Sequence, residues 1–276
     1  MEFRGKKIFQ GSFDIYAEDY QSVRPTYPMQ LYRDVQKVCK ISKHSKMLEI
    51  GAGTGIATEE LAKTGASVIA LEPGENLVKI AKKRLNSYKN VSIICDTFEN
   101  YQHTEKFDVA LAFTSFHWLT DEHKYEKISN MLRSNGKLVV VWNSFMQSDT
   151  SVVSKIEELY HKHLPDIYPS ISSTSEVNSN VIAKLTKRIG ELVANPEFQV
   201  VYLSEYATAY EYDEDTYPKL LNTFPKIINI ADTKQKDNFL REVSTVVAEH
   251  GKIVVPILST LIVLQFKEDF IRTIIS

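Results

Sequence analysis

The sequence predicts an α/β protein built around a parallel sheet, and three observations lead to this fold class. Between about residues 46 and 143, short β-rich runs alternate with longer stretches of helical period, which is the pattern of parallel β-α-β units. A glycine turn joins the first run to a helical stretch, an arrangement that suits a nucleotide-like ligand. The 276 residues are 43% hydrophobic, which is enough for a large buried core.

The parallel core is expected in residues 46–145. Runs rich in β-branched residues predict five strands, and apolar residues at helical spacing predict three helices between them. The strands are expected at 47–50, 67–72, 91–95, 107–113 and 137–142, and the helices at 55–64, 75–86 and 121–133.

Three further segments surround this core. Residues 1–45 are expected to cap a ligand site, with a tyrosine-rich arm at 13–27 and a helix at 29–40 that begins after Pro28. Residues 146–196 predict a helical insertion over the pocket, and residues 197–276 are expected to complete the sheet and the cap. Their helices are expected at 151–163, 176–193, 215–230 and 233–250, and their strands at 198–210 and 260–266, which pair at one sheet edge. The last strand should begin after Pro256, since proline cannot sit in a central ladder.

Charge and composition exclude several classes of protein. The 33 basic and 35 acidic side chains give a net charge of −2, so no general attraction to nucleic acid or to an anionic membrane is expected. Two cysteines cannot form a disulfide framework, and both are expected to be buried in a cytoplasmic protein. His161 and His163 are two residues apart and point in different directions on a helix, so no metal site is expected.

The glycine turn of residues 51–55 carries the strongest functional signal. Glycines allow positive φ and a close approach of the backbone to a ligand. The dinucleotide fingerprint requires a glycine at position 56, where this chain has Ile56. Glu49 precedes the turn, and a carboxylate suits an amine-bearing ligand better than a pyrophosphate. This spacing therefore argues against a nicotinamide cofactor.

Acidic residues end the next two predicted strands. Glu72 lies 72 − 51 = 21 residues beyond Gly51, where a carboxylate can accept hydrogen bonds from both hydroxyls of a ribose. Asp96 is followed by Thr97 and Phe98, and an acid beside an aromatic ring can hold an adenine. These residues predict an adenosine-type ligand.

Residues 49–55, Glu72, Asp96 and the strand Phe107-Asp-Val-Ala110 resemble the motifs of class I S-adenosylmethionine-dependent methyltransferases. Within that family, residues 20–28 and the cluster at 115–118 resemble the small-molecule branch that includes trans-aconitate methyltransferase-like proteins. The resemblance implies a Rossmann-like, mostly parallel sheet of seven strands with an antiparallel last strand. Helices would cover both faces.

The resemblance also implies roles for individual residues. S-adenosylmethionine, and its product S-adenosylhomocysteine, would be bound by the arm, the glycine turn and the strand ends, namely Tyr20, Arg24, Glu49, Gly51, Ala52, Gly53, Thr54, Gly55, Glu72, Pro73, Asp96, Thr97, Phe98 and Phe113. The acceptor pocket would be lined by Tyr20, Arg24, Tyr27, His117 and Trp118.

The sequence lacks the motifs of two other functions that could share this fold. A reductase should carry a Tyr-x-x-x-Lys pair, which is absent, and a base-directed methyltransferase should carry an Asp/Asn-Pro-Pro motif where residues 113–116 read Phe-Thr-Ser-Phe. A non-catalytic protein that only binds S-adenosylmethionine stays open, because no catalytic base is identifiable. A carboxylate acceptor needs no base, so an O-methyl ester is the expected product, with Arg24, Tyr27 or His117 as the anion anchor. A monomer or homodimer is expected.

Overall fold

The sheet has seven strands in the order β3-β2-β1-β4-β5-β7-β6. The structure is a computed structural model that describes residues 13–102, 104–119 and 123–267. The first five strands pair in parallel, and β7 is antiparallel to both β5 and β6. This confirms the expected mostly parallel sheet with an antiparallel last strand. The strands are β1 (Lys46–Ile50), β2 (Ser67–Leu71), β3 (Val91–Ile94), β4 (Phe107–Phe113), β5 (Leu132–Phe145), β6 (Phe198–Tyr212) and β7 (Ile253–Phe266).

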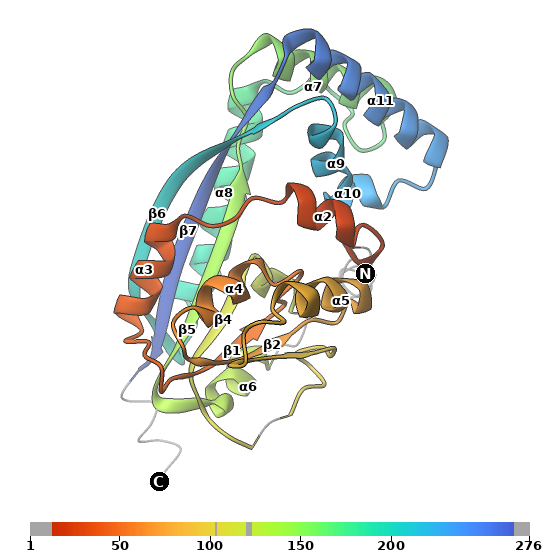
Figure 1. Ribbon diagram of the computed structural model, residues 1–276. Helices are drawn as coiled ribbons and strands as arrows, with labels where there is room; N and C mark the ends of the chain where they lie inside the picture. The colour runs from red at the N-terminus through yellow and green to blue at the C-terminus, as the bar shows by residue number, and fades with distance from the viewer. Residues whose placement is uncertain (1–12, 103, 120–122, 268–276) are drawn as a thin grey trace.

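Helices cover both faces of the sheet (Figure 1). In chain order they are α2 (Ala17–Val23), α3 (Met29–Val38), α4 (Ile56–Ala62), α5 (Glu75–Arg84), η1 (Phe116–Trp118), α6 (Lys124–Met131), α7 (Ser151–His163), α8 (Thr174–Val193), α9 (Thr216–Asn222), α10 (Pro225–Ile228) and α11 (Thr233–His250). Helices α3 and α4 share one hydrophobic cluster with the sheet, and α6 and α8 share the other.

Alternation along the strands produces these two clusters, because successive side chains of a strand point to opposite faces. In β1, Met47 joins the α3–α4 side, while Leu48 and Ile50 join the α6–α8 side. Strand β4 is buried on both faces and is therefore almost continuously apolar. The parallel core places its carboxyl strand ends, where ligands bind in such sheets, beneath α2.

A cap stands above the parallel core on the long strands. Strands β5, β6 and β7 have 14, 15 and 14 residues, and they continue beyond the core to α7 and α11 (Figure 1). Helices α7, α9, α10 and α11 form a third hydrophobic cluster with the far ends of β6 and β7. The cap and the core therefore share continuous strands.

The structure corrects two elements that contain proline. The helix expected at 215–230 is two helices, because Pro225 begins α10 after α9 has ended at Asn222. Strand β7 begins at Ile253 and includes Pro256. The Pro256 carbonyl accepts a hydrogen bond from the Met146 nitrogen, just beyond the end of β5. In an antiparallel strand the nitrogen and carbonyl of one residue face the same neighbour, so the nitrogen of Pro256 faces the segment just beyond β5. The ladder between β7 and β6 therefore loses no hydrogen bond at this proline.

The insertion at 146–196 is divided between two places. Helix α7 belongs to the cap, whereas α8 packs on β5 and β6 with Leu185 and Leu192 in the core. The position of this segment over the acceptor pocket stays a prediction. Cys39 is buried as expected, but Cys95 is exposed after β3. No described helix is both long enough and apolar enough to cross a membrane.

Candidate active site

The turn after β1 has the backbone conformation that its glycines were expected to supply. Gly51, Gly53 and Gly55 have φ angles of +72°, +60° and +80°, which side-chain-bearing residues rarely adopt. A Cβ atom on Gly51 would also lie 2.6 Å from the Cβ of Ser115. The turn therefore needs glycine both for its backbone and for the close packing of the loop after β4.

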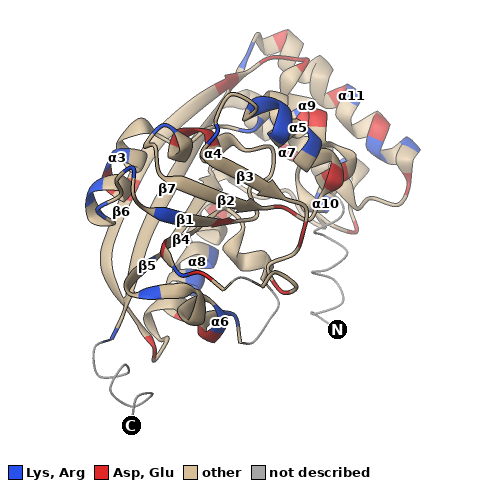
Figure 2. Ribbon diagram, turned by 60° about the horizontal axis from the view of Figure 1, so that its bottom comes forward, with Lys and Arg blue, Asp and Glu red and all other residues tan. Residues whose placement is uncertain are grey.

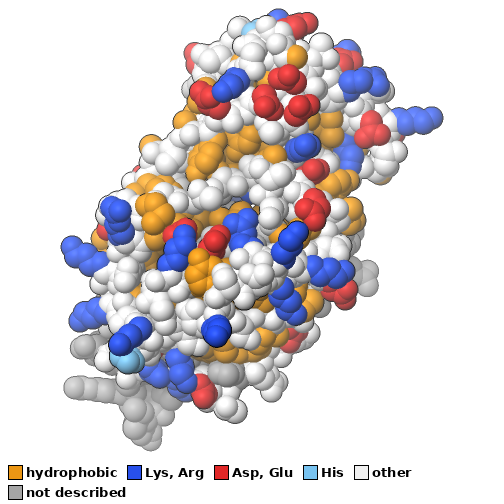
Figure 3. All heavy atoms as spheres, in the orientation of Figure 1, with side chains coloured by type: hydrophobic (Ala, Val, Ile, Leu, Met, Phe, Trp, Pro, Cys, Tyr) orange, Lys and Arg blue, Asp and Glu red, His pale blue; other side chains and the backbone are white. Residues whose placement is uncertain are grey.

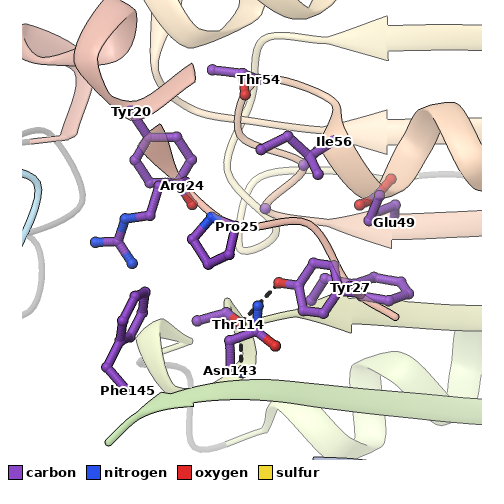
Figure 4. A pocket seen from close by; sticks show the side chains of 14 residues that line it. Tyr20, Arg24, Pro25, Tyr27, Glu49, Thr54, Ile56, Thr114, Asn143 and Phe145 are labelled. Atoms are coloured by element: carbon purple, nitrogen blue, oxygen red, sulfur yellow. Dashed lines mark hydrogen bonds between the residues drawn. The ribbon is translucent and has the colours of Figure 1, made fainter. Parts of the chain in front are cut away.

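A pocket lies beside this turn, between the arm and the ends of β4 and β5 (Figure 4). It brings together most of the predicted arm and turn residues with several that the sequence did not single out. Its walls are Tyr20, Arg24, Pro25, Tyr27, Glu49, Gly51, Ala52, Thr54, Ile56, Ala57, Phe113, Thr114, Asn143 and Phe145.

Glu49 is the acidic residue of the pocket and is only 1% exposed. Its Oε2 accepts a hydrogen bond from Thr58 at 2.6 Å, whereas its Oε1 has no partner. Burial raises the pKa of Glu49 to about 8, with a smaller contribution from Glu72 in the same direction. A buried acceptor without a partner costs free energy, and the Thr54 hydroxyl is also buried and unpaired. The pocket thus leaves polar atoms for a ligand that carries a cation.

Glu72 connects the turns that follow β1 and β2. Its Oε2 accepts a hydrogen bond from the Gly53 nitrogen at 2.8 Å, and its Oε1 accepts one from the Gly74 nitrogen at 2.9 Å. Burial nevertheless raises the pKa of Glu72. Each carboxylate oxygen has a second lone pair, so Glu72 fits the expected ribose contact while it holds the glycine turn. Pro73 lies in the second of these turns.

Arg24 is the cationic residue of the pocket. Its Nε and Nη2 donate to the hydroxyl and carbonyl oxygens of Thr223 at 2.9 and 2.7 Å. The guanidinium lies 5.0 to 5.4 Å from the ring centres of Tyr20, Phe145 and Phe224, and burial lowers its pKa. Within the described ranges Nη1 has no hydrogen-bond partner and no carboxylate forms an ion pair with Arg24. Figure 4 shows Arg24 and Glu49 on opposite sides of the pocket.

The arm contacts both the core and the cap. Asp14 accepts hydrogen bonds from the backbone nitrogens of Asn76 and Leu77 at 2.7 and 3.0 Å, and so caps α5. On the cap side, Lys236 of α11 donates to the Tyr16 hydroxyl at 2.7 Å. The arm is therefore anchored above the pocket from both directions.

Thr114 and Asn143 are site residues that sequence reasoning missed. Thr114 has φ +54°, which is a strained conformation for a β-branched residue. Its hydroxyl lies 2.9 Å from the Tyr27 hydroxyl and accepts a hydrogen bond from the Asn143 nitrogen. The Asn143 Oδ1 accepts a hydrogen bond from Ser259 of β7 at 2.5 Å. The sequence contains one signal for these two residues, which is the position of Thr114 directly after a predicted strand.

His117 and Trp118, which were expected in the acceptor pocket, do not line it. The 3-10 turn η1 places the Nδ1 of His117 3.2 Å from the Trp142 indole nitrogen, which donates to it. Trp118 packs edge-on against Phe13 of the arm, with ring centres 5.6 Å apart. Both residues therefore belong to the surroundings of the pocket.

The Asp96–Phe98 turn also lies outside the lining. Asp96 accepts a hydrogen bond from the Thr97 nitrogen. Phe98 is 3% exposed within the core, and the Lys127 ammonium lies 5.0 Å over its ring. An adenine contact by these residues stays a prediction. Among the described residues no cluster of three or more His, Cys, Asp or Glu side chains could hold a metal ion.

Comparison with known proteins agrees with this architecture. The family model described as "Methyltransferase domain" matches residues 48–140, from β1 into β5. An uncharacterized methyltransferase of Schizosaccharomyces pombe is 24% identical over 240 residues, which are 86% of this chain and 87% of that one. An uncharacterized methyltransferase of Bacillus mycoides is 30% identical over 150 residues, or 51% of this chain and 70% of that one.

A relative with a more specific name covers a shorter stretch. A probable S-adenosylmethionine-dependent methyltransferase of Saccharomyces cerevisiae is 30% identical over 122 residues, 42% of each chain. The solved structure of a putative type II methyltransferase from Anaeromyxobacter dehalogenans superposes with a TM-score of 0.61 at 18% identity, covering 88% of this chain and 97% of that one. The chain belongs to the methyltransferase family.

Proposed function

We propose that the protein transfers a methyl group from S-adenosylmethionine to a small-molecule acceptor. The observation that carries this proposal is that an acidic and a basic side chain face one pocket, each with a polar atom that has no partner among the described residues. Glu49 has an unpaired Oε1, and Arg24 has an Nη1 without a partner among the described residues. The methionyl part of S-adenosylmethionine has an ammonium and a carboxylate, which match these two groups.

The chain's residues would hold this cofactor along the strand ends. Glu49 would bind the ammonium, Arg24 with Tyr20 would bind the carboxylate, and Glu72 would bind the ribose hydroxyls. When bound, S-adenosylmethionine supplies an electrophilic methyl group on its sulfonium. The chain itself contributes alignment and exclusion of water, which can lower a barrier by ~7–11 kcal/mol. The arm above the pocket and the aromatic side chains of Phe113 and Phe145 exclude that water.

A carboxylate is the acceptor group that the pocket supports best. Burial raises the pKa values of Tyr20 and Tyr27, so both phenols keep their protons and neither acts as a general base near neutral pH. An acceptor that is already anionic needs no base. We therefore propose an O-methyl ester as the product and the trans-aconitate methyltransferase-like branch as the subfamily. We also propose that residues 1–45 and 197–276 contribute to the cap.

Calorimetric titration tests the cofactor. S-adenosylmethionine and S-adenosylhomocysteine should bind with micromolar affinity, while NADH and NADPH in the same buffer should not bind. Glu49→Gln should weaken binding at least ~10-fold, because a charge-assisted hydrogen bond is lost. Glu60→Gln is the matched control, since Glu60 lies on the outer side of α4 in an ion pair with Lys63. Equal affinities in both variants would contradict the role of Glu49.

Turnover tests the reaction. With methyl-labelled S-adenosylmethionine, a panel of small carboxylic acids should yield methyl esters. A methylated amine or thiol would contradict the carboxylate acceptor. Cofactor binding without turnover on acids, amines, thiols and hydroxyl compounds would instead favour a non-catalytic binding protein.

A further inference from the structure

Asn143 lines the pocket with an amide of which one end is occupied. It lies opposite Ser259 in the antiparallel pairing of β5 with β7, and its Oδ1 accepts a hydrogen bond from the Ser259 hydroxyl at 2.5 Å. Ser259 is fully buried, whereas Asn143 is half-buried. Among the described residues this is the only hydrogen bond of either side chain. Because the nitrogen of an amide carries two N–H donors, the Nδ2 of Asn143 remains for a ligand.

Asn143 points to the face of the sheet that carries the pocket. Val141, two residues earlier on β5, belongs to the α3–α4 cluster together with the pocket residue Phe113, and alternate residues of a strand share a face. Tyr206 of β6, which pairs with Ser259, packs against the same cluster. The hydrogen bond between Ser259 and Asn143 therefore lies on this face as well.

Tyr27 brings a second donor to the same part of the pocket. Its hydroxyl lies 2.9 Å from the Thr114 hydroxyl, which also accepts a hydrogen bond from the Asn143 nitrogen at 3.2 Å (Figure 4). Burial raises the pKa of Tyr27, so the phenol keeps its proton. Thr114 keeps its strained φ of +54° while its nitrogen donates to the Val141 carbonyl at 2.7 Å. Such strain is concentrated at functional sites.

These two donors lie apart from the residues that would hold the cofactor. Figure 4 shows Thr54 of the glycine turn and Asn143 on opposite sides of the pocket. In the proposed function, Glu49 and Arg24 take the ammonium and the carboxylate of the methionyl part. The amide of Asn143 and the hydroxyl of Tyr27 are then left for the second ligand, which is the methyl acceptor.

We propose that the Nδ2 of Asn143 and the Tyr27 hydroxyl hold one oxygen of an acceptor carboxylate, while its other oxygen takes the methyl group. This inference rests on the proposed function and adds the residues that select the acceptor. The second carboxylate oxygen supplies the electron pair for the new bond to the methyl carbon. The bond from that carbon to the sulfonium breaks, its electron pair stays on sulfur, and no proton moves.

Uncharged donors suit this step, because they bind the carboxylate without neutralising its charge. Hydrogen bonds to an ionised acceptor are about twice as strong as those between neutral groups. The neutral ester would therefore be held more weakly than the acid from which it forms, which favours release of the product. Ser259 would act as a positioning residue, since its hydroxyl keeps the oxygen of the amide turned away from the acceptor.

Calorimetry at pH 8 on the protein saturated with S-adenosylhomocysteine tests Asn143, with benzoate and benzylamine as probes of similar shape and opposite charge. Benzoate should bind in the millimolar range or tighter. Asn143→Asp keeps the shape of the side chain and the acceptor for Ser259, but replaces the donor by a negative charge. Benzoate should then bind at least about tenfold more weakly, and benzylamine more tightly. A general disturbance of the pocket would weaken both.

Asn238→Asp is the matched control for the added charge. Asn238 is exposed on α11, whose ribbon in Figure 2 carries both acidic and basic residues. This variant should bind both probes like the original protein.

Ser259→Ala tests the positioning of the amide. Without the hydroxyl, the amide of Asn143 can turn its oxygen toward the pocket, so benzoate should bind severalfold more weakly and benzylamine should lose no affinity. Thr260→Val is the control on the same strand. It removes a buried hydroxyl from the residue opposite Trp142, on the other face of the sheet, and should change neither affinity.

The proposal is overturned if benzoate does not bind the original protein, if Asn143→Asp binds it as tightly as Asn238→Asp does, or if both probes weaken together in Asn143→Asp. S-adenosylhomocysteine is titrated into the original protein first. If it binds and benzoate does not, the acceptor site alone is wrong. If S-adenosylhomocysteine does not bind, the proposed function fails as well.

Discussion

At the scale of single residues, Glu49 combines a cost in stability with its proposed role as the contact of the cofactor ammonium. Its buried carboxyl has a pKa of about 8, well above its ordinary value of 4.5. The folded protein therefore holds this proton more tightly than the unfolded chain does. Between these two pH values the contribution of Glu49 to the free energy of unfolding falls as pH rises. The carboxylate weakens the ligand-free fold and is matched by a cation only when a ligand binds.

This leads to a prediction about Glu49→Gln in the absence of ligand. The variant should melt at a higher temperature than the original protein near about pH 8, and the difference should shrink toward about pH 5, where both carry a neutral side chain. Thermal melts at the two pH values measure this. A difference that does not change with pH would show that the carboxyl is not responsible.

Glu72 carries a second prediction at this scale. Glu72→Ala should weaken S-adenosylmethionine binding at least ~10-fold, since the ribose contacts and the support of the Gly53 and Gly74 nitrogens are lost together. Glu75→Ala, three residues later in the first turn of α5, is the control. Calorimetry that finds unchanged affinity for Glu72→Ala would refute the assignment.

The residues that could be predicted from the sequence are those whose role depends on local conformation. The glycine turn, Glu49 and Glu72 lie next to predicted strand ends, so their place at the sheet edge followed from the β-α-β pattern. Asn143 could not be found in this way, because its side chain is oriented by Ser259, 116 residues away. The hydrogen bond of His117 could not be found in this way either, because its partner Trp142 lies on another strand.

At the scale of elements, the attachment of the arm to the core can be tested through Asp14, which caps α5. Asp14→Ala should destabilise the protein by ~0.5–2 kcal/mol, because α5 loses its cap. It should also speed cofactor dissociation and proteolysis of the arm. Ser173→Ala removes the cap of α8, where Ser173 accepts a hydrogen bond from the Glu176 nitrogen. This control should cost similar stability and leave cofactor dissociation unchanged. Equal dissociation rates in both variants would contradict a closing role for the arm.

Helices with their own end signals were predicted well. Helix α7 has the expected bounds, with the side chain of Thr150 as its N-cap, and α11 ends as expected at His250, before Gly251. The predicted elements were wrong at Pro225, which begins a separate helix, and at Pro256, which lies within a strand. Whether a proline breaks a helix or is tolerated in a strand depends on which backbone groups face it. For Pro256 the decisive fact is where β5 ends, which its own segment does not contain.

At the scale of the whole molecule, cofactor binding should raise the melting temperature. At a hundredfold excess over the dissociation constant, a ligand of the native state adds ~2.7 kcal/mol. For a chain of this size that corresponds to a shift of about 5 °C. S-adenosylhomocysteine should produce this shift in thermal melts and NADH should not. A shift with NADH alone would mean that the glycine turn binds a different cofactor.

The mostly parallel sheet of seven strands with an antiparallel last strand was expected, whereas its strand order was not predicted from the sequence. The cap was harder to predict, since its position depends on how far β5, β6 and β7 extend past the core. In Figure 3, hydrophobic side chains gather on the visible face where the cap meets the core.

The anchoring of the arm has a consequence for the order of events during synthesis. The arm leaves the ribosome early, but Thr223 and Lys236, its partners on the cap, follow Arg24 by 199 residues and Tyr16 by 220. A nascent chain can therefore complete its parallel core, glycine turn included, while the arm still lacks these contacts. The pocket acquires this cover only after residues 223 and 236 have been made, so a nascent chain that lacks them has a pocket that is open on this side.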